Sequence, residues 1–206
     1  MGLGEDVKEV LRDVGLGFTI HKFDGTSISG EFLDYTVNRQ VTKPFIREFF
    51  LEIMLPYDTQ AVAGDLISFD GDGRRFLIMN LTPEIFEGDI TEFNAVLYKV
   101  NASGEVFRAS GEMNSDYHTT ETWQRVAGCE VLITERLFGT ELDQFSIIGQ
   151  VEVEANDLYI SGNAGIRPMD RFQVNPPSGE VYKVEVVKRH QFDNVHVCTI
   201  VEDTRA

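Results

Sequence analysis

The sequence has few of the residues on which catalysis and metal binding usually depend. Its 206 residues include only two cysteines, four histidines and one tryptophan. No His-Glu-x-x-His or Cys-x-x-Cys motif is present, and Cys129 and Cys198 lie in apolar runs typical of strands. We therefore expect two buried free thiols, and neither a disulfide nor a metal site.

The motifs of phosphate binding and nucleophilic catalysis are missing as well. There is no Gly-x-Gly-x-x-Gly after a strand, no Gly-Lys-Ser/Thr and no Gly-x-Ser-x-Gly elbow. His190, His196 and Cys198 could place three ligands near the last turn, but exposed polar positions beside a buried thiol are the favoured explanation. Asp65 and Asp170 are possible general acids or bases, although their common place after a bend favours a turn-capping role. We predict no enzyme and no cofactor.

Long apolar runs and basic clusters are also absent. No apolar run approaches the roughly 20 residues that span a bilayer, so no membrane partner is expected. The start, Met1–Asp6, lacks the basic and apolar regions of a secretion signal, which predicts a protein made and kept in the cytoplasm. Arg74–Arg75 and Lys188–Arg189 are the adjacent basic pairs, too few for an electrostatic DNA footprint.

Acidic residues are abundant instead. The chain has 34 acidic against 18 basic residues, a net charge of −16. Residues 1–103 and residues 104–206 each carry 17 acidic and 9 basic residues, so the charge belongs to both halves. Spread acidity argues against a site that holds phosphates by counterion release. It indicates either colloidal solubility or a surface that lets a polyanion pass without sticking.

Strand-like alternation dominates the chain and repeats once. Asp65–Asn101 and its weaker echo Asp170–Asp203 both begin with an acidic residue after a bend, alternate for one short strand, turn, and continue through two more β-rich runs. The matching positions are Ile67, Phe69, Phe76 and Ile78 in the first copy, and Phe172, Val174, Tyr182 and Val184 in the second. Either the unit is duplicated, or two β-meanders simply look alike.

The strand count sets the fold class. Ten or more short strands predict an all-β protein of two tandem small β-barrel or β-sandwich domains, residues 1–103 and 104–206, with one short N-terminal helix. That helix is expected at Glu5–Val14, and a further strand at Phe45–Leu55. The helix has one apolar stripe, which docks either on its own domain or on a neighbouring subunit, through Val7, Val10, Leu11 and Val14.

Three other segments stand out as interaction or turn candidates. Thr82–Glu92 is predicted to be a projecting acidic loop, with Glu84, Glu87, Asp89 and Glu92 as its acidic residues. Ala102–Tyr117 suits a linker or an extended arm, and Trp123, in a polar setting, is either a core anchor or an interface hot spot. Asp70–Gly73 resembles a calcium loop, but Arg74 and Arg75 follow and no Glu stands at the twelfth position, so a hairpin turn is predicted.

The second copy resembles a known class of proteins. Its features are the bend at Pro168–Asp170, a glycine hairpin, the run Val181–Val184, a basic turn and a terminal alternating strand. Together, residues 165–203 resemble the small β-barrels of tailed-bacteriophage neck proteins, which complete the head, stop the DNA channel or join head to tail. The chain departs from this class in length, since many such proteins are single barrels of about half its size.

The resemblance implies a structural role without catalysis. It implies a homo-oligomeric ring between a portal or adaptor protein and a tail protein, around a channel for double-stranded DNA, assembled in the bacterial cytoplasm and retained in the virion. Spread acidity would then keep DNA from sticking. Val7, Val10, Leu11 and Trp123 are the expected assembly contacts. Two alternatives stay open: another tail part, such as a tail terminator, tube or baseplate hub, and a monomeric β-barrel ligand-binding module or enzyme.

Overall fold

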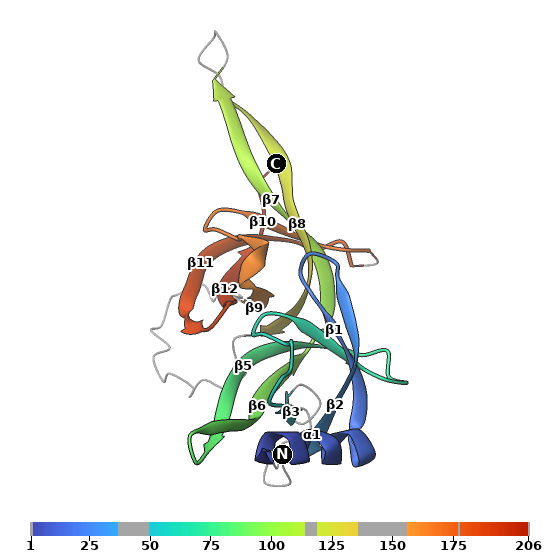
Figure 1. Cartoon of the computed structure of the whole chain (residues 1–206). Helices are drawn as coiled ribbons and strands as arrows, with labels where there is room; N and C mark the ends of the chain where they lie inside the picture. Colours follow the sequence, from blue (N-terminus) through green and yellow to red (C-terminus); the bar gives the residue numbers. More distant parts are fainter. Residues whose placement is uncertain (1, 37–49, 114–118, 136–155, 177, 206) are drawn as a thin grey trace, which may run out of the picture. The chain divides into compact units, whose positions relative to one another are not determined.

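A computed structural model describes residues 2–36, 50–113, 119–135, 156–176 and 178–205 (Figure 1). The chain is all-β with one N-terminal helix, as predicted. It divides into two compact units, Met1–Val100 with Phe192–Val195, and Asn101–Gln191 with His196–Ala206. Within the described ranges, no helix has the length and apolar character needed to cross a bilayer.

The first unit contains a closed antiparallel barrel. Its elements are α1 (Leu3–Val14), β1 (Leu16–His21), β2 (Ser27–Thr36), β3 (Phe50–Pro56), β4 (Leu66–Phe69), β5 (Arg75–Phe86) and β6 (Asp89–Lys99). The strand order is β1-β2-β3-β6-β5-β4, and pairing of β1 with β4 closes it. Inward side chains, among them Phe18, Ile20 and Phe76, form one buried cluster. The sequence predicted this core from alternation of apolar and polar residues.

The second unit has its own six-stranded sheet and its own core. Its strands are β7 (Ala102–Met113), β8 (Thr119–Glu135), β9 (Asn156–Ser161), β10 (Arg171–Val174), β11 (Val181–Phe192) and β12 (Val195–Glu202), with one 3-10 turn at Gly162–Ala164. The order is β10-β11-β12-β9-β8-β7, and β10 pairs with β7 to close the barrel. Val106, Phe172 and Ile200 belong to its buried cluster.

The two barrels share one topology. When β7 to β12 are matched in order with β1 to β6, the sequence of hydrogen-bonded neighbours is the same in both sheets. Register agrees too, because Ile67 lies opposite Ile20 as Phe172 lies opposite Val106. The structure therefore supports a duplicated unit, and extends it from the predicted meander to the whole barrel.

Asp65 and Asp170 occupy equivalent bends. Both are buried, at 2% and 3% exposure. One carboxylate oxygen of Asp65 accepts a hydrogen bond from the backbone N–H of Val62 at 3.0 Å, and Asp170 accepts one from that of Arg167 at 2.8 Å. The predicted turn-capping role is confirmed for both residues.

Each bend aspartate also pairs with a cation that the sequence did not reveal. Lys22 lies 2.6 Å from the Asp65 carboxylate, and Arg108 lies 2.7 Å from that of Asp170. Lys22 follows β1 and Arg108 lies on β7, so the cations come from matching parts of the two barrels. A buried carboxylate needs such a partner to remain charged at low cost.

For the connecting segments, the structure corrects one expectation, confirms another and leaves part of the chain undescribed. Of the two alternatives predicted for Ala102–Tyr117, the linker is wrong, because Ala102–Met113 forms strand β7 and pairs with β8. An extended arm agrees with the long β7–β8 hairpin in Figure 1. The expected boundary between residues 103 and 104 therefore falls within a strand. Asp70–Gly73 lies in the tight connection between β4 and β5, as predicted for a hairpin. Of the strand expected at Phe45–Leu55, residues 50–55 belong to β3, as predicted. Residues 45–49 and 136–155 lie outside the described part.

Candidate functional site

The end of the β5–β6 hairpin in the first unit carries three exposed apolar side chains. The acidic loop predicted at Thr82–Glu92 is wrong: β5 and β6 run to a two-residue turn at Glu87 and Gly88, with φ of 52° and 95°. Positive φ at both central residues matches the twist of a hairpin. Figure 1 shows this hairpin, in green, reaching beyond its barrel. The segment projects as expected, but as paired strands.

Three apolar side chains gather at this end, which we call the hairpin tip (residues 84–92). Ile85, Phe86 and Ile90 are 61%, 55% and 41% exposed. Ile85 lies directly opposite Ile90, and Phe86 opposite Asp89. Apolar residues clustered on a projecting element are typical of an interaction site.

Acidic side chains surround the apolar ones. Glu84 lies directly opposite Glu92, and Glu87 and Asp89 lie exposed at the turn. Burial and the neighbouring charge of Glu84 raise the pKa of the Glu92 carboxyl. The amide of Asn94 donates a long hydrogen bond of 3.4 Å to Glu84. Like charges directly across a hairpin repel each other, so the tip carries a charge pair that a cation would stabilise.

Helix α1 buries only part of its apolar stripe. Leu11 is buried at 4% exposure and Val7 is partly buried, where the helix packs on β2, β3 and β6. Val10 and Val14 are 58% and 79% exposed. The helix therefore docks on its own barrel through Leu11 and leaves Val10 free of burial, so a role for Val10 in assembly stays a prediction.

A groove of about 420 Å³ lies beside the helix. Its apolar walls are Ile28, Phe32 and Pro56, and Lys8 and Arg12 reach it from α1. Lys8 pairs with Asp58. Within the described residues, no hydrogen bond or ion pair is found for Arg12. We call this cavity the α1–β2 groove; sequence analysis missed it because its walls come from three separate segments.

Trp123 lies on strand β8. It is half-buried, and the guanidinium groups of Arg171 and Arg205 lie 3.9 Å and 5.1 Å from its ring centre. Both arginines also pair with the fully buried carboxylate of Asp203, at 2.7 Å and 2.8 Å. Burial alone would raise the pKa of Asp203, but hydrogen bonds from Arg205 and Arg171 hold that pKa well below its usual range. Trp123 thus packs against the two arginines that hold Asp203, and its role as a core anchor or an interface contact stays a prediction.

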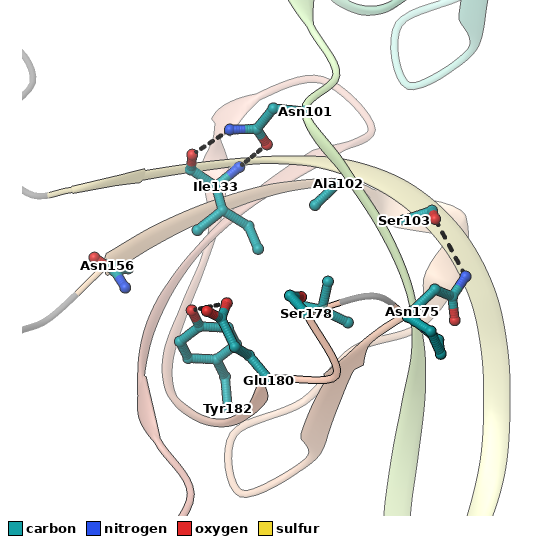
Figure 2. Close-up of a pocket in the computed structure, with 11 residues that line it drawn as sticks. Asn101, Ala102, Ser103, Ile133, Asn156, Asn175, Ser178, Glu180 and Tyr182 are labelled. Carbon is teal, nitrogen blue, oxygen red and sulfur yellow. Dashed lines mark hydrogen bonds between the residues drawn. The ribbon is translucent and has the colours of Figure 1, made fainter.

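A second cavity, of about 530 Å³, opens at one end of the second barrel (Figure 2). Its lining is mainly polar: Asn101, Ser103, Asn156, Asn175, Ser178, Glu180 and Tyr182. The Tyr182 hydroxyl donates to Glu180 at 2.7 Å, and burial together with Glu180 raises the pKa of Tyr182 to about 12. Asn101 is held at both ends of its amide by the backbone of Ile133. These groups suit hydrogen bonding to a neutral polar molecule.

Neither cysteine lines the α1–β2 groove or the polar cavity. Cys129 and Cys198 are free, and burial raises the pKa of each thiol to about 12. Cys198 is fully buried, as predicted, whereas Cys129 is only partly buried. Among the residues described, no group of three His, Cys, Asp or Glu side chains is placed to hold a metal ion.

No family model, no curated protein and no solved structure matches this chain. Function is therefore argued from the hairpin tip, the α1–β2 groove and the polar cavity of the second barrel.

Proposed function

We propose that the chain is a structural virion protein that forms a homo-oligomeric ring at the neck of a tailed bacteriophage. It joins a portal or adaptor protein to the tail around the DNA channel. The observation that carries this proposal is the hairpin tip, where Ile85, Phe86 and Ile90 are exposed on strands that extend beyond a closed barrel. A closed barrel has no edge strand for partners to pair with, so a projecting hairpin is the natural assembly contact.

The remaining properties of the chain are consistent with this role. The segment that resembles neck proteins, residues 165–203, contains β10, β11 and β12 of the second barrel. The net charge of −16 is shared by both halves of the sequence, and an acidic lining would repel the DNA backbone during its passage.

Two other functions compete with the neck ring. A tail terminator, tube or baseplate hub would use the same assembly contacts, and only its place in the particle distinguishes it. A monomeric ligand-binding module is favoured by one observation, the polar cavity near Tyr182 and Asn101. That module requires no contact through the hairpin tip.

Oligomeric state separates these classes. Light scattering coupled to size exclusion, followed by negative-stain electron microscopy, should show closed rings of the purified chain at high concentration. A strict monomer that binds small polar molecules would favour the ligand-binding module. Cryo-electron microscopy of the particle then distinguishes a ring between head and tail from one elsewhere in the tail.

A further inference from the structure

We propose that the hairpin tip of one copy inserts into the α1–β2 groove of the next copy. This inference rests on the proposed ring and names the contact that would close it. Both surfaces belong to the first unit, so each copy offers one tip and one groove. The occupant of the groove is thus a second copy of this chain.

The tip has the properties of an insertion element. Its strands are paired up to the turn, and Glu87 and Gly88 adopt the left-handed conformations that such a turn requires. A preformed element loses little conformational entropy when it binds. Ile85, Phe86 and Ile90 would leave water on insertion, which supplies the apolar driving force.

The groove has the properties of a receptor. Its volume of about 420 Å³ lies within the range of roughly 300–1,000 Å³ that is usual for sites that bury small ligands, enough for side chains at the end of a hairpin. Ile28, Phe32 and Pro56 offer apolar contact, and none of the tip residues lines the groove of its own copy.

The groove offers one cation to the acidic tip, because its two carboxylates, Glu31 and Asp58, already have partners within the same copy. The tip presents Glu84 and Glu92 as a repelling pair, with the pKa of Glu92 raised by burial and by Glu84. Arg12 is exposed at the groove, and the described structure gives it no ion pair. An arginine placed between two carboxylates would remove their repulsion and gain charge-assisted hydrogen bonds. In a chain as acidic as this one, an exposed cation with no ion pair among the described residues is the natural recognition point for an acidic tip.

The contact is heterologous, because two different surfaces of the same unit meet. Repeated head-to-tail contacts of this kind build a ring if the rotation closes, and a filament if it does not. Two tips meeting symmetrically would instead stop at a dimer. The inference therefore predicts multimers beyond the dimer, each held by the same pair of surfaces.

Disulfide trapping tests the contact directly. The full-length double variant Glu87→Cys with Ser29→Cys carries one thiol at the turn and one at the groove, both at exposed positions. Mild oxidation should yield a ladder of dimers, trimers and larger species on a non-reducing gel. The matched control, Glu87→Cys with Glu9→Cys, places the second thiol on an exposed part of α1 outside the groove and should give no ladder above the dimer.

A charge exchange supplies an independent readout. Arg12→Glu, at an exposed position, should lower the affinity between copies by tenfold or more while its melting curve stays close to wild type. Adding Glu92→Lys should recover much of the lost affinity. Rings without a ladder or charge rescue would overturn the contact and leave the proposed function standing. If the wild-type chain forms no rings and the Glu87→Cys with Ser29→Cys variant gives no ladder, both the contact and the proposed function are overturned.

Discussion

At the residue scale, buried charge decides where the fold is most sensitive. Asp65 and Asp170 each combine a capping hydrogen bond with an ion pair, and each fixes the bend that begins β4 or β10. Either carboxylate, if removed, leaves a backbone N–H and a cation without their partner. Asp65 and Asp170 share burial and ion pairing with Asp203, and the composition of the sequence does not distinguish these acids from the exposed ones.

The first prediction concerns Asp170. Asp170→Ala should lower the free energy of unfolding by about 2–3 kcal/mol, because the buried bend loses its cap and its charge-assisted hydrogen bonds. The cost stays at the lower end since the side chain of Arg108 is 31% exposed and can return to water. Urea titration measures it. Glu9→Ala, at an exposed position of α1, is the control, and an equal effect of both variants would contradict the assignment.

The second prediction concerns Glu92. Its pKa is raised in the fold by burial and by Glu84, from an ordinary value of 4.5. A carboxyl whose pKa rises on folding destabilises the fold as the pH climbs above that ordinary value, and has no effect well below it. Glu92→Gln should therefore stabilise the chain by about 0.5 kcal/mol at pH 7, with the gain vanishing below about pH 4.

The same substitution should act in the opposite direction on assembly. If Glu92 meets Arg12 of another copy, Glu92→Gln weakens multimers at pH 7 while it stabilises the single chain. Thermal melts and light scattering on one sample measure both effects. A variant that gains in stability and assembles as well as wild type would place Glu92 outside the interface.

At the element scale, prediction from sequence succeeded where a strand has a buried face. β1, β4 and β10 alternate inward apolar and outward polar residues, and their cores are where the pattern placed them. β5 changes character along its length: its first half is buried and its last five residues are exposed. Cross-strand backbone hydrogen bonds hold that outer half together. Such hydrogen bonds do not require apolar side chains, so the pattern of apolar residues does not reveal them. For this reason the sequence pattern predicts a loop at Thr82–Glu92 and a linker or extended arm at Ala102–Tyr117.

The third prediction concerns the turn of the projecting hairpin. Gly88 has φ of 95°, a region that costs an L-residue roughly 1–2 kcal/mol. Gly88→Val should therefore loosen the tip, lower amide-exchange protection from Ile85 to Ile90, and weaken assembly, while the barrel core stays protected. Gly73→Val is the matched control, because Gly73 has open space around it and no positive φ. Unchanged protection at the tip would contradict this account of the turn.

At the scale of the whole molecule, the duplicated pattern was the most informative property of the sequence. The bends and alternating strands persisted in both copies because each is required to begin and close a barrel. The α1–β2 groove and the polar cavity could not be predicted from the sequence. The α1–β2 groove brings together Lys8, Ile28 and Pro56 only after the first barrel closes. The polar cavity brings together Asn101, Asn156 and Tyr182 only after the second barrel closes. The spacing of residues along the sequence does not predict contacts between such distant segments.

The last prediction concerns net charge and assembly. Copies that each carry −16 repel one another beyond contact distance, and the Debye length falls from about 30 Å at 0.01 M salt to about 8 Å at 0.15 M. Salt in this range should screen that repulsion more than it screens a seated tip, where charges lie within a few ångströms. Multimers should therefore grow in abundance as salt rises to 0.15 M, as measured by light scattering at fixed protein concentration. Dissociation over the same range would mean that exposed opposite charges, and not the apolar tip, hold the copies together.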